Sequence, residues 1–254
     1  MDKKTNPTDQ ARRHFFGKVA AMASLTVAPG IILQQVAHAR APELPASNRQ
    51  RWGILINTNK CAEGCDACVT ACQDEYGWGP NSPETHSAPE QKAQWIRKVK
   101  LTDKQTGHVQ TLPLMCQHCE HPPCVDVCPT GASFKRADGI VLVDKHICIG
   151  CRYCMMACPY KARSFIHEEL HEQSPDVPRG KGTVESCTLC VHKIDRGDGI
   201  TACADACAKA GYKAIIFGDL KDPDSEISKQ LLAYPSKQIR QDFNLNTGVR
   251  YKGI

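Results

Sequence analysis

The sequence contains few aromatic residues and no long uninterrupted apolar run. Aromatic residues make up 6% of its 254 residues, and hydrophobic residues of all kinds make up 41%. A chain of this length and composition can form one or two domains with a modest apolar core. The apolar stretch Val19–Leu33 is interrupted by Pro29 and Gly30, and it is short beside the roughly 20 residues that span a bilayer. No other segment is long and apolar enough, so we expect no transmembrane helix.

The surplus of positive charge is also small. The formal net charge is +5, but residues 1–39 carry five of the lysines and arginines and only two acids, which leaves +2 for residues 40–254. Binding to nucleic acid depends on a strongly basic surface. The composition therefore argues against a nucleic-acid partner.

Residues 1–39 have the layout of an export signal. A basic region, an apolar region and a small-residue cleavage site follow one another. Their residues are Arg12, Arg13, Phe15, Phe16 and Lys18, then Val19–Leu33, then Ala37, His38 and Ala39. An arginine pair followed by an aromatic residue and a lysine resembles the twin-arginine signal. We expect residues 1–39 to be a twin-arginine signal peptide that ends at Ala39, and residues 40–254 to be a periplasmic protein.

Cysteine is the abundant residue, with sixteen copies in four groups of four. The groups are Cys61-x3-Cys65-x2-Cys68-x3-Cys72, Cys116-x2-Cys119-x4-Cys124-x3-Cys128, Cys148-x2-Cys151-x2-Cys154-x3-Cys158 and Cys187-x2-Cys190-x12-Cys203-x3-Cys207. An even number of cysteines is compatible with disulfide bonds or with metal sites. The spacing must therefore distinguish the two.

The third group matches the bacterial ferredoxin pattern C-x2-C-x2-C-x3-C-P, with Pro159 in the last position. Three close cysteines can wrap one face of a 4Fe–4S cluster, and the fourth ligates the other cluster in two-cluster ferredoxins. The second group follows the same logic with a longer middle gap. The connector between the two groups contains a turn at residues 130–132, a hairpin signal at 137–139 and a β-branched run at 140–143.

Two other roles for the cysteines remain open at this stage. Disulfide bonds are common in exported proteins, and the fourth group alone could form a zinc ribbon. The repeated ferredoxin spacing favours iron, and a twin-arginine route carries folded proteins, so clusters could be inserted before export. Sixteen thiolates for four cubane clusters leave no iron open to a substrate, which favours electron transfer over catalysis. We expect His118 and His121 to tune or shield a cluster, and His167 and His171, which a helix would bring together, to be solvated.

Short strands are expected between the cysteine groups. Alternating or β-branched patterns predict a strand at residues 52–57, a hairpin formed by 95–101 and 108–114, and a strand at 214–217. Residues 77–94 and 168–185 read as loops. A helix start is predicted at residues 222–225, and the tail beyond it is expected to wrap the body or a partner.

The stretches "CQHCEHPPCVDVCPTGA", "CTLCVHKIDRGDGITACADAC" and "AIIFGDLKDPDSEIS" resemble the four-cluster ferredoxin family, whose members are electron-transfer subunits of membrane-bound respiratory complexes. The resemblance implies an α+β fold with two ferredoxin-like double-cluster units in a pseudo-symmetric arrangement, loop insertions and a C-terminal extension. One unit would comprise residues 52–76 and 183–218, the other residues 113–165, and the C-terminal tail residues 219–254.

The resemblance also implies which cysteines share each of four 4Fe–4S clusters. The expected sets are Cys61, Cys65, Cys68 with Cys207; Cys187, Cys190, Cys203 with Cys72; Cys116, Cys119, Cys124 with Cys158; and Cys148, Cys151, Cys154 with Cys128. The chain departs from the family pattern at two points. One additional residue separates Cys61 from Cys65, and Ala208 follows Cys207 where the family usually has proline.

Within the family, the leader and the closing "GVRYKGI" look most like DsrO, the periplasmic ferredoxin of DsrMKJOP complexes. The implied partners are an integral membrane quinone-interacting subunit of the NrfD or DsrP type, a haem c subunit and other complex subunits, with no small-molecule substrate of its own. The alternative is an NrfC-like, tetrathionate-reductase-type or polysulfide-reductase-type subunit. A disulfide-linked binding protein and a zinc-stabilised interaction protein are the hypotheses from other classes.

Overall fold

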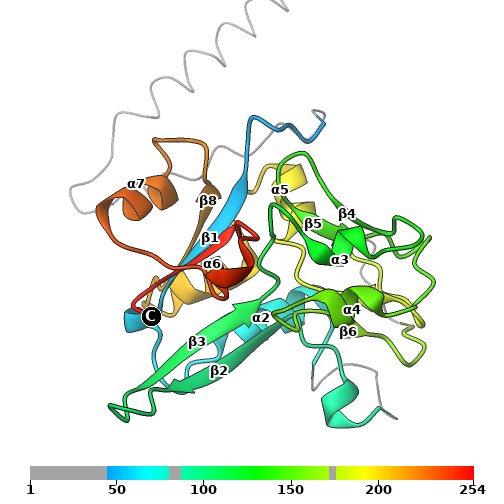
Figure 1. Ribbon diagram of the computed structural model, residues 1–254, viewed down its shortest axis with the longest axis horizontal. Coiled ribbons are helices and arrows are strands. Elements are labelled where there is room, and N and C mark those ends of the chain that lie inside the picture. Colours follow the sequence, from blue (N-terminus) through cyan, green and yellow to red (C-terminus); the bar gives the residue numbers. More distant parts are fainter. Residues whose placement is uncertain (1–44, 80–86, 172–175) are drawn as a thin grey trace, which may run out of the picture. The chain divides into compact units, whose positions relative to one another are not determined.

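The structure is a computed structural model that describes residues 45–79, 87–171 and 176–254 (Figure 1). The signal peptide predicted at residues 1–39 lies outside the described residues. Within them, no helix is both long enough and apolar enough to span a bilayer. The described chain is a mixed fold of short helices and small sheets.

The largest sheet among the described residues has three strands, and β1 (Trp52–Asn57) is its central strand. Strand β8 (Ile215–Asp219) pairs antiparallel with β1, and β9 (Val249–Lys252) pairs parallel with it. The predicted strand at residues 52–57 is confirmed, and the strand predicted at 214–217 is confirmed with a shift of one residue. The continuous apolar run of β1 is explained by its burial on both faces.

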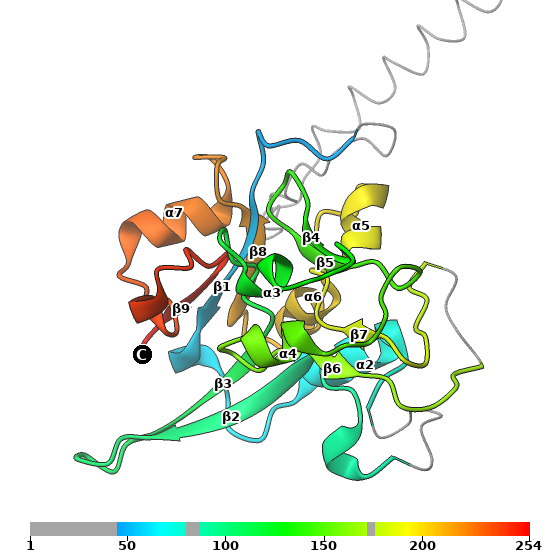
Figure 2. The same ribbon diagram turned by 45° about the vertical axis from the view of Figure 1, so that its right-hand side comes forward.

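Two helices pack beside this sheet, and a third packs on one of them. Helices α2 (Ala67–Tyr76) and α6 (Ala202–Lys209) pack against each other, and α7 (Glu226–Ala233) lies against β8 (Figures 1 and 2). The hydroxyl oxygen of Ser225 accepts a hydrogen bond from the Ser228 N–H and caps α7. The helix start predicted at residues 222–225 is therefore confirmed.

The remaining strands form two-stranded hairpins or ribbons. Strands β2 (Ile96–Thr102) and β3 (Val109–Met115) form a long antiparallel hairpin that extends away from the other elements (Figure 2). The hairpin predicted from residues 95–101 and 108–114 is confirmed. The pairs β4 (Ser133–Lys135) with β5 (Val141–Val143), and β6 (Ser164–Phe165) with β7 (Val184–Glu185), are shorter.

Short helical turns lie near the cysteine groups and in the loops. They are η1 (Thr58–Lys60), η2 (Pro89–Gln91), α3 (Pro123–Asp126), α4 (Tyr153–Ala157), α5 (Val191–Arg196) and η3 (Gln241–Phe243).

The C-terminal tail returns to the second cysteine group. The Gly248 N–H donates to the carbonyl oxygens of Gln117 at 2.9 Å and His118 at 3.1 Å. An isolated antiparallel bridge also joins Thr247 to Cys119. The end of the chain therefore ties β1 to the loop that carries Cys116 and Cys119.

Candidate metal centres

The structure brings the sixteen cysteines together in four sets, and all sixteen, which lie within the described residues, carry free thiols. We call the sets site 1 (Cys61, Cys65, Cys68, Cys207), site 2 (Cys72, Cys187, Cys190, Cys203), site 3 (Cys116, Cys119, Cys124, Cys158) and site 4 (Cys128, Cys148, Cys151, Cys154). Each set combines three cysteines of one motif with the last cysteine of another. The first motif contributes to sites 1 and 2 together with the fourth, and the second contributes to sites 3 and 4 together with the third.

A left-handed residue directly before the second cysteine is common to all four motifs. These residues are Gly64 (φ 77°), His118 (φ 44°), Gly150 (φ 68°) and Leu189 (φ 54°). Such a turn can direct successive backbone N–H groups toward one point, as in anion-binding loops. The additional residue of the first motif lies before this turn, so the motif keeps the left-handed residue that the other three have before their second cysteine.

Gly150 shows that the loop conformation is also fixed by packing. A Cβ atom at this position would collide with the carbonyl oxygen of Gly182, and it would lie 3.0 Å from the ring of Phe165. Its positive φ is also a conformation that L-residues rarely adopt. The third motif therefore requires glycine before Cys151.

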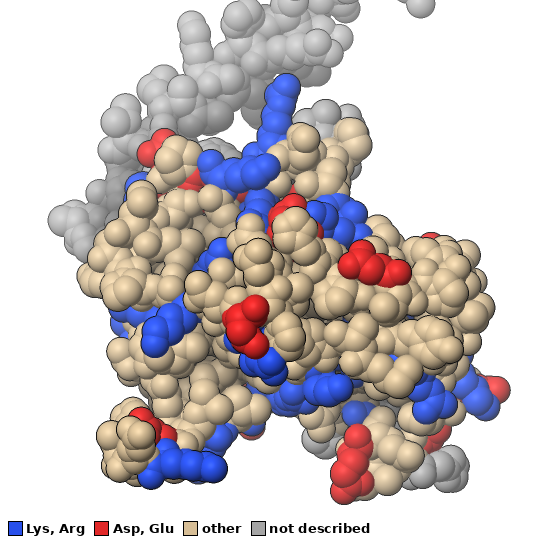
Figure 3. All heavy atoms as spheres, in the orientation of Figure 1, with Lys and Arg blue, Asp and Glu red and all other residues tan. Residues whose placement is uncertain are grey.

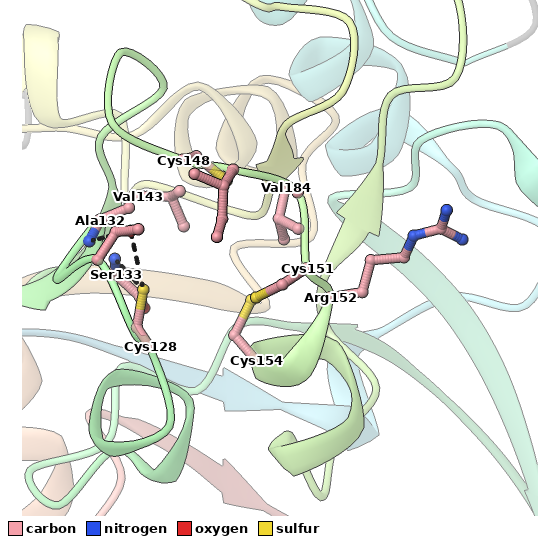
Figure 4. Close-up of a pocket in the computed structure, with 12 residues that line it drawn as sticks. Cys128, Ala132, Ser133, Val143, Cys148, Cys151, Arg152, Cys154 and Val184 are labelled. Atoms are coloured by element: carbon pink, nitrogen blue, oxygen red, sulfur yellow. Dashed lines mark hydrogen bonds between the residues drawn. The ribbon is translucent and has the colours of Figure 1, made fainter.

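Sites 2 and 3 are buried, whereas sites 1 and 4 reach the surface. All four cysteines of site 2 and all four of site 3 are buried. In site 1, Cys61 and Cys65 are half-buried; in site 4, Cys128 and Cys148 are half-buried and Cys151 is exposed. Figure 4 shows Cys128 facing Cys151 and Cys154 across the pocket at site 4, while the Arg152 guanidinium points away from it.

The four sites lie in series. The thiol of Cys203 in site 2 is close enough to Cys68 in site 1 for a charge there to raise its pKa. A charge on Cys116 of site 3 likewise raises the pKa of Cys187 in site 2, so these two thiols are close. A charge on Cys154 of site 4 raises the pKa of Cys124 in site 3, so these two are close as well. The order is therefore site 1, site 2, site 3, site 4, with the two exposed sites at the ends.

Burial governs the protonation of most of these thiols. Burial raises the pKa of Cys68 in site 1 to about 12, and it raises the pKa of Cys203 in site 2 to the same value. Neighbouring cysteines add to the increase in each site. Without a cation to stabilise them as thiolates, these side chains stay protonated at neutral pH.

Cys128, at the surface end of site 4, differs from the buried thiols. Burial acts to raise its pKa, but the Ser133 N–H and the Thr130 hydroxyl lower it, and its pKa lies below the ordinary value. The Ser133 N–H donates to the Cys128 sulfur at 3.3 Å. Hydrogen bonds of this kind favour the thiolate, which is the form that binds metal.

Backbone N–H groups donate to sulfur at two other sites as well. The Ala202 N–H lies 3.4 Å from the Cys190 sulfur of site 2, and the Ala214 N–H lies 3.3 Å from the Cys207 sulfur of site 1. Hydrogen bonds to sulfur are one of the means by which a protein sets the reduction potential of an iron–sulfur cluster.

Two buried polar groups near site 3 could donate hydrogen bonds to a group held at that site. The His118 ring accepts a hydrogen bond at Nδ1 from the Val141 N–H at 3.0 Å, which leaves the proton on Nε2. Neither His118 Nε2 nor the Tyr160 hydroxyl, both buried, has a hydrogen-bond partner among the described residues. Burial raises the pKa of Tyr160, and charges on Cys119 and Cys158 raise it further. The Tyr160 hydroxyl therefore lies near the sulfurs of site 3.

These features fit a 4Fe–4S cluster at each site. Iron stabilises thiolates that burial alone would keep protonated, and inorganic sulfides accept hydrogen bonds. In the described part of the chain, no three His, Cys, Asp or Glu side chains converge closely enough to share one metal ion; instead, four cysteines line each of the pockets at sites 1 and 4.

Several residues that contact the sites were not predicted from the sequence. Lys98 lines site 1 and donates to the carbonyl oxygens of Ala62 and Cys65. The Trp78 indole lies near the Cys72 thiol of site 2, whose pKa it lowers against the larger effect of burial. Arg163 is 5% exposed and contacts the Cys124 sulfur at 3.0 Å. A sequence gives no sign that such charged or aromatic residues will turn toward sulfur.

The histidines divide between buried and exposed positions. His118 is buried beside site 3, whereas His121 is exposed. His167 and His171 do not lie in a helix, so they do not share a helix face. His167 instead packs edge-on against the Phe165 ring at 4.8 Å.

Comparison with known protein families matches two overlapping parts of the chain. Residues 60–132 and residues 107–219 each match a 4Fe–4S dicluster domain. Together the two matches include all four cysteine motifs. The mixed fold of short helices and sheets is therefore that of a protein with ferredoxin-type 4Fe–4S domains.

Relatives that align with nearly the whole chain include two oxidoreductase subunits and protein NrfC. The chain is 39% identical to Hdr-like menaquinol oxidoreductase iron-sulfur subunit 1 of Archaeoglobus fulgidus, over 95% of this chain and 97% of the relative. It is 33% identical to a subunit of the tetrathionate reductase of Salmonella typhimurium, over 97% and 89%. It is also 34% identical to protein NrfC of Escherichia coli, over 91% and 89%.

The cysteine sites, the two domain matches and the near full-length relatives agree. This chain belongs to the family of 4Fe–4S dicluster proteins that serve as iron–sulfur electron-transfer subunits of larger oxidoreductase complexes and are not themselves the catalytic subunits.

Proposed function

We propose that this protein carries four 4Fe–4S clusters, one at each of sites 1 to 4, and relays electrons through them within a membrane-bound complex. The sixteen cysteines of the four sets would be the ligands. The observation that carries this proposal is the series of four cysteine sets in which the inner two are buried and the outer two reach the surface. Each cluster would supply one-electron chemistry with little change in structure.

The chain's own residues would hold and insulate this relay. Burial at sites 2 and 3 excludes water from the inner part of the path. The backbone N–H groups of Ser133, Ala202 and Ala214 donate to cysteine sulfurs and stabilise their negative charge. With all four positions of each cluster filled by cysteine, no iron would be left for a substrate, which matches a role in electron transfer.

The two ends of the series would contact different partners. Near site 4, the apolar side chains of Ile149, Tyr153 and Met156 are 66%, 54% and 65% exposed. Figure 3 shows that the surface over α4 is mostly uncharged. Such a surface suits a protein interface better than solvent, and Cys151 at its edge would bring site 4 within reach of a partner's redox group.

We further propose that the complex is of the DsrMKJOP type and lies on the periplasmic side of the membrane. By this proposal, the twin-arginine leader exports the protein, and its partners are a haem c subunit and a quinone-interacting membrane subunit of the NrfD or DsrP type. The similarity to a menaquinol oxidoreductase subunit supports a quinone-linked complex. The similarities to NrfC and to the tetrathionate reductase subunit support the alternative assignment.

The pseudo-symmetric arrangement of two double-cluster units is part of the same proposal. The first and fourth motifs supply sites 1 and 2, and the second and third motifs supply sites 3 and 4. Each pair of motifs would form one ferredoxin-like unit, with the tail 219–254 joining the two through Gly248 and Gln117.

Anaerobic metal and sulfide analysis tests the cluster content. The proposal predicts about sixteen iron and sixteen acid-labile sulfide per chain, because each cluster contains four of each. About four zinc without sulfide would instead indicate zinc sites, and a colourless protein with blocked thiols would indicate disulfides. Genes for dissimilatory sulfite reductase beside the reading frame would support the DsrMKJOP assignment, and a pterin-containing reductase gene would contradict it.

A further inference from the structure

Arg163 lies in the interior of the fold. In the chain it follows Cys158 of site 3 and directly precedes strand β6. Only 5% of the residue is exposed. Its Nη2 donates hydrogen bonds to the Cys124 sulfur of site 3 at 3.0 Å and to the Ser133 hydroxyl at 2.8 Å. The guanidinium is therefore in direct contact with a proposed cluster ligand.

The same guanidinium also lies close to site 4. Burial raises the pKa of Cys154, and the positive charge of the nearby Arg163 lowers it. Ser133, which accepts from Arg163, donates its backbone N–H to the Cys128 sulfur of site 4. Arg163 therefore contacts one cysteine of site 3 directly, lies near Cys154 of site 4, and is linked through Ser133 to Cys128 of site 4.

The charge of Arg163 has no carboxylate partner within the described residues. Its hydrogen bonds go to sulfur and to one hydroxyl, and Nε and Nη1 have no oxygen acceptor in this part of the chain. A buried charge requires compensation by opposite charge or strong hydrogen bonds. Around Arg163, the cysteines of sites 3 and 4 are the groups that can supply it, once they are thiolates bound to iron.

We propose that Arg163 is a positioning residue that sets the reduction potentials of site 3 and site 4 together, by holding one positive charge between them. This inference rests on the proposed function. Reduction adds negative charge at a site, and a buried cation in contact with its ligands stabilises that added charge. Because one guanidinium contacts a ligand of site 3 and is linked through Ser133 to a ligand of site 4, both potentials should respond to its removal.

Redox titration of Arg163→Gln, followed by electron paramagnetic resonance, tests this role. Glutamine keeps a polar side chain of related shape without the charge. Two of the four midpoint potentials, those of sites 3 and 4, are expected to shift to more negative values, and those of sites 1 and 2 to stay unchanged. Arg163→Lys keeps the charge, so its potentials should stay closer to those of the wild type than to those of Arg163→Gln.

Arg152→Gln is the matched control. Arg152 is next to Cys151 of site 4, but it is exposed, and its guanidinium lies over the Phe165 ring at 4.2 Å. Solvent screens such a charge. All four potentials of Arg152→Gln are therefore expected to match the wild type.

The outcomes separate this inference from the proposed function. A wild-type protein without about sixteen iron overturns the proposed function itself. A fully loaded Arg163→Gln protein with unshifted potentials, or with only one shifted potential, overturns the shared role of Arg163 alone. If Arg163→Gln fails to retain its clusters, the iron content of Arg163→Lys is decisive. Full iron content in Arg163→Lys supports the need for the charge. Loss of iron equal to that of Arg163→Gln shows that the residue only packs, which overturns the inference.

Discussion

The thiol of Cys187 lies close enough to that of Cys116 for charge on the second to raise the pKa of the first. Cys187 belongs to the fourth cysteine motif and Cys116 to the second, so the two pairs of motifs lie close together here. This pair of thiols links site 2 to site 3, both of which are buried. The proposed electron path passes from one pair of motifs to the other at this point.

The cysteine sets predict which substitutions affect the same cluster. Cys72→Ser and Cys190→Ser should alter the same electron paramagnetic resonance signal, because both residues belong to site 2. Cys68→Ser should alter a different signal, although Cys68 is closer in sequence to Cys72. If Cys68→Ser and Cys72→Ser alter one common signal instead, the pairing of the first motif with the fourth is wrong.

Cluster uptake by the metal-free protein should depend on pH. Burial raises the pKa of Cys116 and of Cys203 to about 12, so iron binding must displace protons, and uptake should increase from pH 7 to pH 9. The proton released on reconstitution can be measured in weakly buffered solution. Uptake that is independent of pH in this interval would contradict the raised pKa values.

The stability of the metal-free protein should decrease as pH rises, whereas cluster uptake should increase. A buried thiol with a raised pKa keeps its proton in the folded state, whereas the unfolded thiol loses its proton near pH 8.5. The unfolded state then binds fewer protons, and the free energy of unfolding falls as pH rises above about 8. Denaturant unfolding of the metal-free protein at pH 7 and pH 9.5 measures this difference, and equal midpoints would contradict it.

A buried ion pair at the end of β7 should contribute strongly to stability. Glu185, which is 1% exposed, accepts from Arg179 Nη2 at 2.9 Å and from Trp95 Nε1 at 2.8 Å. Glu185→Ala leaves a buried guanidinium without this carboxylate, which should cost about 3–5 kcal/mol in the free energy of unfolding. Denaturant titration of the clusters' absorbance measures the loss.

The exposed pair of Glu169 and Lys181, 3.8 Å apart, supplies the control. Glu169→Ala should change stability by less than about 1 kcal/mol, because solvent screens exposed pairs. Equal effects of Glu169→Ala and Glu185→Ala would show that burial does not strengthen the pair of Glu185 and Arg179.

Export can be tested separately from the clusters. Substitution of both Arg12 and Arg13 by lysine should keep the protein in the cytoplasm, because the twin-arginine route requires the arginine pair. Cell fractionation followed by immunodetection measures the location. Arrival in the periplasm at the normal level would contradict the leader assignment.

The elements predicted correctly were those whose local pattern is strong. The apolar run of β1, the alternation in β2 and β3, and the cap at Ser225 are local signals that need no knowledge of the rest of the chain. Strand β9 was not predicted. Only Val249 and Tyr251 in it are buried, and its partner β1 lies at the opposite end of the described chain.

Helices α2 and α6 were also not predicted, because their buried faces consist largely of cysteines. Cys68, Cys72 and Tyr76 are buried in α2 at intervals of four residues, and Cys203 and Cys207 repeat this interval in α6. This spacing is a helical signal. It is hard to recognise because the same cysteines also have the spacing of metal ligands.

The role of Arg163 could not be read from the sequence. An isolated arginine is usually solvated, and only the fold brings this one to Cys124 and Ser133. The cysteine groups are different, because their short spacing itself requires them to be close together.

The most direct test of the four-cluster relay is an anaerobic crystal structure with diffraction data collected at the iron absorption edge. We expect four iron clusters in series, the first held by the site 1 cysteines and the last by those of site 4, with sites 2 and 3 between them. Fewer than four clusters, or a cluster held by cysteines from a different combination of motifs, would contradict the relay.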